Sequence, residues 1–362
     1  MNKTIKKDAL EILKLFKKTN KESIKFACAT DYFYLENLID SFFPNTEWFK
    51  IPDEIVKTYE DNIGIFKKTE INIRKQIYNN LDLLEKMYEQ IIDMFEKAKV
   101  EEINDNIDYK LSMDEIDAEV FENFFNKYEG LNELFIKIYN EKRLLLVDSY
   151  GPSYTYNLKS INKDYIVVSS ADPIHVLVSL SHEMGHVYQS KIYKDKNLDI
   201  YFFLVEFMSI LMEHLFCDYY QEVDPKISYI MTINKLAVWS KIFKVSLAQI
   251  KLFKKHENAF DNLKLYTKYN NELDSLCTTD FNFKKDDLYL NFYPIGFMIA
   301  INFFYQLKYG LDFNEVQKFY ILNNEKNNLN DLLTNYVDLD AIKEYLREYT
   351  IIDRPKIFKK NM

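Results

Sequence analysis

Glycine and proline, the residues that most often end helices and strands, are scarce in this chain: there are 6 glycines and 7 prolines among 362 residues. With so few places at which a regular element must end, long helices are expected to dominate. Between Ile77 and Phe95 the apolar residues recur at steps of three and four, with Lys and Glu between them. The final third, from Val316 to Leu346, repeats this pattern around an asparagine-rich break at 323–330. The sequence therefore predicts a mainly α fold.

Two short aliphatic runs interrupt the helical pattern, Arg143–Val147 and Asp164–Ser170. Both are bounded by turn-forming residues such as Gly151 and Asn162, so they are predicted to be strands of a small sheet. No segment rich in Pro, Gly and Ser marks a domain boundary. We expect one continuous unit, with an N-terminal helical lobe over residues 1–140 and a catalytic core with C-terminal helices over residues 141–362.

The residues that indicate chemistry are those of the motif HEMGH, from His182 to His186, inside an apolar run that reads as a helix. Histidines four residues apart in a helix lie one turn apart and within about 40° of each other, so both rings can reach one ion. Glu183, beside the first ring, can take a proton from a water at the metal without becoming a ligand. This spacing is typical of zinc metallopeptidases and predicts one Zn²⁺ per chain.

A second apolar segment, Ile200–Tyr220, is predicted to be a helix and contains Glu206 in surroundings that otherwise exclude charge. A buried carboxylate is costly unless it is paired or bound to metal. Glu206 follows His186 by twenty residues, a separation that lets an antiparallel neighbouring helix supply a third ligand. Two histidines and a glutamate leave a fourth position for water, which is the catalytic arrangement of zinc.

Two further polar residues share the predicted face of Glu206. Ser209 follows it by three residues and Glu213 by seven, so both are candidates for hydrogen bonding to the ligands from one layer further out. The alternative for each is a polar side chain at the solvent edge of an amphipathic helix. His214 and His175 are each interpreted as structural histidines.

The two helical segments resemble the zinc peptidases of the thimet oligopeptidase and oligoendopeptidase F group. The zinc helix of that family reads HExGHxxH, and this chain has HEMGHVYQ from His182 to Gln189. The family's second helix has a pattern close to EVASTFNE, which resembles EFMSILME from Glu206 to Glu213. The resemblance covers about residues 140 to 310 and implies a helical zinc-peptidase fold with a small sheet bordering the active-site cleft. It also implies a shortened and divergent member, because the family's proteins are larger.

A later segment, DLYLNFYPIGFMIA from Asp287 to Ala300, resembles the family's stretch HFYxxFYxxxYA. The resemblance implies that Tyr289 and Tyr293 contact the substrate carbonyl and the developing oxyanion. A phenol suits that role because it stays protonated at neutral pH, and loss of one oxyanion donor costs about 10²-fold or more in rate. The alternative is packing, since the chain has 28 tyrosines.

The chain departs from the family pattern at three positions. Asp287 stands where the family has a histidine, Phe297 where it has its last tyrosine, and Gln189 where it has a third zinc-helix histidine. None of these changes removes a zinc ligand or the general base. The leading hypothesis is a zinc peptidase acting on oligopeptides or an unfolded leader peptide. The departures favour the alternative, a catalytically impaired pseudopeptidase that binds peptides, and a purely helical structural protein with a chance motif is a third interpretation.

The remaining composition restricts partners and location. A net charge of −9 without a stripe of Lys and Arg argues against nucleic acid as a partner. The N-terminal residues lack the uninterrupted apolar core of a secretory signal, and charged residues interrupt the best candidate for a membrane span. We therefore expect a cytoplasmic protein whose partner is a peptide substrate. Its cysteines, Cys28, Cys217 and Cys277, are isolated from one another in sequence and are predicted to be inert core residues.

Overall fold

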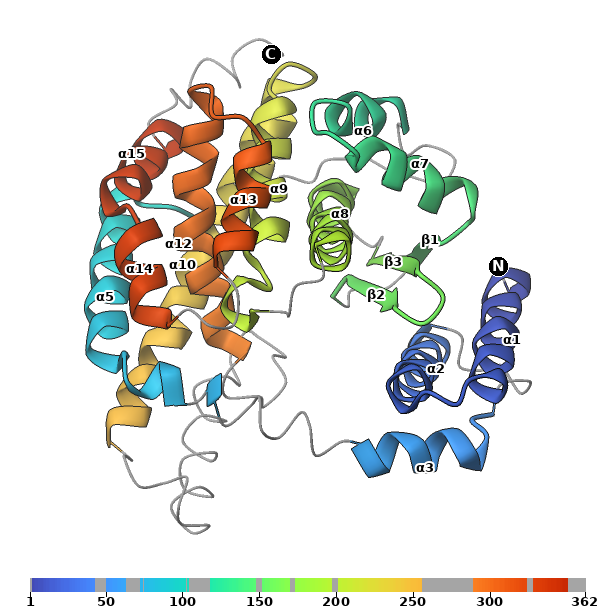
Figure 1. Cartoon of the computed structure of the whole chain (residues 1–362). Helices are drawn as coiled ribbons and strands as arrows, with labels where there is room; N and C mark the ends of the chain where they lie inside the picture. The colour runs from blue at the N-terminus through green and yellow to red at the C-terminus, as the bar shows by residue number, and fades with distance from the viewer. Residues whose placement is uncertain are drawn as a thin grey trace. The chain divides into compact units, whose positions relative to one another are not determined.

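The computed structural model describes residues 2–42, 50–62, 72–73, 75–101, 103, 118–147, 152–169, 173–196, 201–255, 289–323 and 328–350. The described chain consists of helices and one three-stranded sheet, so the prediction of a mainly α fold with a small sheet is confirmed (Figure 1). The chain forms two compact units, residues 1–71 with 109–191 and residues 72–108 with 192–362, and each is described by itself below. The predicted division near residue 140 stays a prediction.

The first unit combines helices with the sheet. Its elements are α1 (Asn2–Lys18), α2 (Glu22–Phe42), α3 (Asp53–Asn62), α6 (Ala118–Phe125), α7 (Leu131–Asn140), β1 (Leu144–Val147), β2 (Tyr154–Leu158), β3 (Lys163–Ser169) and α8 (Pro173–Asp195), the last belonging to this unit as far as Lys191. Helix α1 packs against α2, and α2 packs against α3 and β2. Their apolar faces form a core with β1, β2 and β3.

The sheet has the strand order β1-β3-β2, with β1 parallel and β2 antiparallel to the central β3. The two predicted strands are confirmed as β1 and β3, each within one residue of its expected start. Strand β2 was not predicted from the sequence. It forms a hairpin with β3 through a turn in which Asn162 has a φ of 55°, the left-handed region that asparagine tolerates better than most residues. Asp31 of α2 accepts the backbone N–H groups of Lys159 and Ser160 at 3.1 and 2.6 Å, so α2 stabilises this turn.

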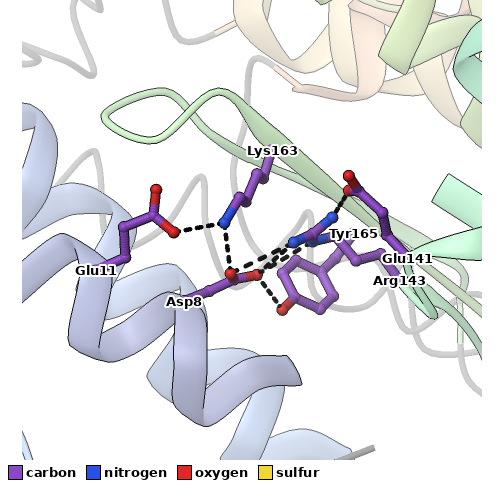
Figure 2. A network of polar contacts seen from close by, with 6 residues as sticks. All are labelled: Asp8, Glu11, Glu141, Arg143, Lys163 and Tyr165. Carbon is purple, nitrogen blue, oxygen red and sulfur yellow. Dashed lines mark hydrogen bonds and ion pairs between the residues drawn. The ribbon is translucent and has the colours of Figure 1, made fainter. Parts of the chain in front are cut away.

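A polar network connects α1 to the sheet around the fully buried carboxylate of Asp8 (Figure 2). Arg143 donates to Asp8 from Nε at 3.1 Å and from Nη2, and Lys163 Nζ donates at 2.7 Å. The Tyr165 hydroxyl also donates to Asp8, at 2.7 Å. Burial acts to lower the pKa of Lys163, but hydrogen bonds to Asp8 and Glu11 outweigh it and raise that pKa. Asp8 is therefore the single anion on which two cations and a phenol converge.

Replacement of Asp8 should destabilise the first unit far more than replacement of its exposed neighbour. Asp8→Asn removes the buried carboxylate shared by Arg143 and Lys163, although Arg143 keeps Glu141 as a partner and Lys163 keeps Glu11. Breaking a buried ion pair typically costs about 3–5 kcal/mol. Glu11→Gln removes a pair whose carboxylate is about half exposed, and is expected to cost below about 1 kcal/mol. Denaturant unfolding of the two variants measures the difference. Equal free energies of unfolding would show that the network contributes no more than a surface pair.

The second unit is built from helices, with no strand among its described residues. Its elements are α5 (Leu81–Ala98), the 3-10 helix η1 (Phe202–Leu204), α9 (Phe207–Tyr219), α10 (Pro225–Lys255), α12 (Tyr289–Lys308), α13 (Asn314–Leu322), α14 (Leu329–Tyr336) and α15 (Leu339–Thr350). Helix α12 packs against α9, α10, α14 and α15, while α5 packs against α10 and α15. The hydrophobic α12 is thus the central helix of this unit.

The apolar face predicted between Ile77 and Phe95 is confirmed as buried, but α5 begins only at Leu81, because a turn at Asn79–Asn80 separates it from Ile77. The members of this face are all buried in the second unit: Ile77, Leu81, Leu84, Tyr88, Ile91 and Phe95. The three C-terminal helices likewise follow the predicted pattern, with a break between α13 and α14. Of the helices that the structure describes, none combines the length and the apolar character needed to cross a bilayer.

Candidate metal centre

The two histidines of the HEMGH motif converge on one point. Both lie in α8, which begins at Pro173, a residue well suited to the first turn of a helix. The Nε2 atoms of His182 and His186 are 3.2 Å apart, and their rings meet edge to face with centroids 4.9 Å apart. Both side chains are half-buried. The predicted one-turn spacing therefore brings two imidazole nitrogens to the same place.

This separation matches what a zinc ion requires. Zn–N bonds of about 2.0–2.1 Å in a tetrahedral site place two ligand nitrogens about 3.3–3.4 Å apart. Imidazole is a common zinc ligand, and neutral imidazole offers one lone pair to a metal. The histidine pair thus fits two adjacent corners of a zinc coordination sphere.

Glu183 lies in the same unit and is almost completely buried, with 4% of its surface exposed. The hydroxyl of Thr155 on β2 lies 2.7 Å from its carboxylate oxygen Oε2 and 3.0 Å from its backbone oxygen. The predicted general base is therefore held by a strand that was not predicted. The aromatic and β-branched run Tyr154-Thr155-Tyr156, ahead of the turn at Asn162, was the signal that could have revealed it.

Glu206 lies in the second unit, and its position corrects the predicted helix Ile200–Tyr220. The segment contains η1 followed by α9, and Glu206 is the N-cap residue of α9. Its carbonyl accepts the N–H of Ile210 at 3.1 Å, the first bond of that helix. The side chain of Glu206 is nonetheless fully buried, as the sequence predicted. The helix starts later because Phe202–Leu204 form a separate 3-10 turn.

Two neighbours hold Glu206 within the second unit. The Ser209 hydroxyl donates to the Glu206 carbonyl at 2.9 Å and lies 3.3 Å from its Oε2 atom. Helix α12 approaches closely at Gly296, where an added Cβ would lie 3.1 Å from the Glu206 backbone carbon and 3.2 Å from its Cβ. The glycine therefore permits α12 to pack directly against Glu206, the predicted third ligand.

Glu213 is buried in α9, two helical turns after Glu206. Its Oε1 atom accepts a hydrogen bond from Lys235 Nζ of α10 at 2.7 Å, and its side chain is 3% exposed. The ion pair balances the charge of the carboxylate in its own unit. The predicted hydrogen bond from Glu213 to a ligand histidine stays a prediction.

His214 is a buried residue of the second unit, which agrees with its structural interpretation. Its Nδ1 atom lies 2.6 Å from the hydroxyl of Tyr345, and its ring contacts Phe297 and Phe304. Burial lowers the pKa of His214 to about 4, with smaller and opposing contributions from Glu213 and Lys235. The imidazole is therefore neutral in the folded protein at neutral pH.

The low pKa of His214 predicts a loss of stability in mild acid. The unfolded chain takes up a proton at this residue near pH 6.5, but the folded chain does so only near pH 4, so the free energy of unfolding falls as pH decreases between these values. A shift of this size corresponds to about 3 kcal/mol in total. His214→Asn keeps an acceptor for Tyr345 and removes the titration. We expect urea unfolding of this variant to depend less steeply on pH between 6.5 and 4 than that of the wild type.

The control for this measurement is His175→Asn, because His175 is exposed on α8. Its pH dependence should match that of the wild type. Comparison with the wild type is necessary because Asp31 also titrates in this range. Burial raises the pKa of Asp31 to about 6. Its contribution to stability has the opposite pH dependence, since it is present at low pH and is lost as pH rises through about 6. An unchanged slope in His214→Asn would contradict the assignment.

The tyrosine segment lies in α12. Tyr289 is the first residue of that helix, and Tyr293 is half-buried with its ring 6.3 Å from the ring of Trp239. Phe297 is fully buried, with its ring 4.9 Å from Trp239 and 5.5 Å from Phe243. Phenylalanine at this position therefore serves core packing in the second unit.

The remaining predicted positions are Gln189, Asp287 and the three cysteines. Gln189 is buried in α8, three residues after His186. Asp287 lies outside the described residues, as does Cys277. Cys28 and Cys217 are buried thiols, so the predicted core position is confirmed for these two, and burial raises the pKa of Cys217 to about 12, which disfavours its thiolate.

Comparisons with known proteins give little beyond these observations. No family model and no curated protein matches the chain. A solved structure provisionally described as an oligoendopeptidase F is similar at a TM-score of 0.47 and 13% sequence identity, and the alignment covers 78% of this chain. This chain spans 58% of that structure's length. A likeness of this size assigns neither family nor activity.

Proposed function

We propose that this chain is a zinc-dependent peptidase that hydrolyses peptide bonds in oligopeptides or in an unfolded leader peptide. The observation that carries the proposal is the pair of Nε2 atoms on His182 and His186, 3.2 Å apart, with the buried carboxylate of Glu183 next to them in the chain. A pair of imidazoles one helical turn apart with an adjacent glutamate is the ligand and base arrangement of zinc metallopeptidases.

Glu206 is the proposed third protein ligand of one Zn²⁺ per chain. Its complete burial supports this role, because a buried carboxylate requires a compensating positive charge or hydrogen bonds. Ser209, which donates to Glu206, would orient the ligand, and Glu213 would act from the next layer of α9. The close approach of α12 at Gly296 further restricts the position of Glu206.

Zinc, when bound by these residues, would lower the pKa of a coordinated water to about 7 and polarise the substrate carbonyl. Glu183 would take the proton from the attacking water and pass it to the leaving amine. Tyr293, with Tyr289 as a second donor, would donate a hydrogen bond to the carbonyl oxygen as it gains negative charge. The half-buried position of Tyr293 is compatible with a hydroxyl that reaches a substrate.

The edge strand β2 is the proposed binding surface for the peptide. It lies at one end of the strand order, and its residue Thr155 contacts Glu183. An extended peptide added beside such a strand would be recognised through backbone hydrogen bonds, with little dependence on its sequence. This mode suits a peptidase that acts on unfolded segments.

Metal analysis of the purified protein, combined with mass spectrometry of a mixed peptide library, tests this proposal. We expect about one zinc per chain and new peptide termini that disappear after chelation and return when zinc is restored. Cleavage that persists in metal-free protein would reject the mechanism. Bound zinc without cleavage of any peptide would instead favour the peptide-binding pseudopeptidase.

A further inference from the structure

Thr155 makes a specific contact with the proposed general base. Its hydroxyl is 2.7 Å from Oε2 of Glu183 and 3.0 Å from the backbone oxygen of the same residue. The hydroxyl therefore contacts both the carboxylate and the backbone carbonyl of Glu183. This contact lies within the first unit and connects β2 to α8.

The sheet register explains why Thr155 points toward α8. Successive side chains of a strand lie on opposite faces. Tyr154 and Tyr156 share one face of β2, with ring centroids 6.1 Å apart, and Tyr156 contacts Tyr34 of α2. Thr155 lies on the other face, paired across the sheet with Ile166 of β3. Pairing with the central strand β3 therefore fixes both the position of Thr155 along the strand and the face of the sheet on which its side chain lies.

The side chain of Thr155 is also well suited to hold a partner. Threonine is branched at Cβ, so few χ1 rotamers are open to it, and its hydroxyl direction is restricted once the backbone is fixed. Glutamate has three rotatable bonds and is poorly ordered unless something holds it. Because the Thr155 hydroxyl contacts both the carboxylate and the backbone oxygen of Glu183, it favours one conformation, in which the Glu183 carboxylate folds back toward its own backbone. The second carboxylate oxygen then remains for water.

We propose that Thr155 is a positioning residue for Glu183, selecting the conformation in which the carboxylate can take a proton from the attacking water. The inference rests on the proposed peptidase function, because it concerns the base of that reaction. Such preorganisation raises the rate of the chemical step more than it changes substrate binding.

Two substitutions separate the hydroxyl from the shape of the side chain. Thr155→Val keeps the branched shape and removes the hydroxyl, so kcat should fall about 10- to 100-fold, as expected for a lost hydrogen bond to a charged group, with KM changed less than about 2-fold. Thr155→Ser keeps the hydroxyl and should retain kcat within about 3-fold. Both variants should keep about one zinc per chain, measured by metal analysis, and a melting temperature close to that of the wild type.

Thr30→Val provides the matched control. Thr30 lies in α2 of the same unit, and its hydroxyl donates to the Phe26 carbonyl at 3.0 Å, so this variant makes the same chemical change away from β2 and Glu183. Its kcat should equal that of the wild type. Unchanged kcat in Thr155→Val, or an equal loss in Thr155→Val and Thr155→Ser, would overturn the positioning role.

A double-mutant cycle tests whether Thr155 acts through Glu183. In a Glu183→Gln background the base is absent, so adding Thr155→Val should lower kcat by less than about 3-fold. A second full loss in that background would mean that Thr155 acts independently, which rejects the inference. Absence of peptide cleavage by the wild-type protein would reject the peptidase function together with this role, whereas cleavage that is insensitive to Thr155→Val would reject the positioning role alone.

Discussion

Glu183→Gln is expected to lower kcat for peptide hydrolysis by about 10²- to 10⁴-fold, the usual contribution of a general base. The substitution keeps the size of the side chain and its place beside Thr155. Because Glu183 is proposed to act next to the metal without binding it, zinc should stay near one per chain. Steady-state kinetics with one cleaved peptide, together with metal analysis of the same preparation, measures both quantities.

The matched control is Glu133→Gln, since Glu133 is an exposed glutamate of α7 in the same unit. Its turnover should be that of the wild type. If Glu183→Gln also retained wild-type turnover, proton transfer would have to use another group. If it lost both zinc and turnover, Glu183 would be a ligand and the proposed division of roles would be wrong.

His186→Ala is expected to reduce bound zinc well below one per chain. It removes one of three proposed protein ligands. Even the loss of a residue that only hydrogen-bonds to a ligand typically weakens metal binding by about 10- to 100-fold. The affinity should therefore fall by at least about 100-fold, and turnover should fall with it. Glu206→Ala should have the same effect on zinc. Competition with a chelator of known affinity measures the change.

His214→Asn is the control for the ligand variants, because His214 is bonded to Tyr345 in the core of the second unit. This variant should bind zinc as the wild type does. Full zinc occupancy in His186→Ala would mean that the metal is bound elsewhere. Loss of zinc in His186→Ala but not in Glu206→Ala would retain the histidine pair and reject the proposed third ligand.

Local patterns in the sequence predicted much of what the structure contains. The three- and four-residue spacing between Leu81 and Phe95 predicted a helix face that is buried in α5. The spacing of His182 and His186 predicted that their rings meet, and their Nε2 atoms are 3.2 Å apart. Both results depend on the geometry of one helix, which is the same in every protein.

Other features depended on contacts between distant segments. Strand β2 has only five residues, and although Tyr154–Leu158 alternate in character, so short a run specifies a strand only once it pairs with β3. The start of α9 was displaced because Phe202–Leu204 form a separate turn. Asp8 has no pattern around it that predicts burial, yet it is fully buried by partners more than 130 residues away.

The sequence alone determined the helical character of this protein, the histidine pair and the carboxylate next to it, because each follows from the period of a single helix. Only the tertiary structure decided which residues hold these groups in place. Thr155 is 28 residues before Glu183, and Lys235 is 22 residues after Glu213. Such contacts form where separate elements pack together, and neither side chain has a local sequence pattern that specifies its partner. The physical reason is that helix periodicity is set by backbone geometry, whereas the partners of a buried polar group are set by the packing of the whole unit.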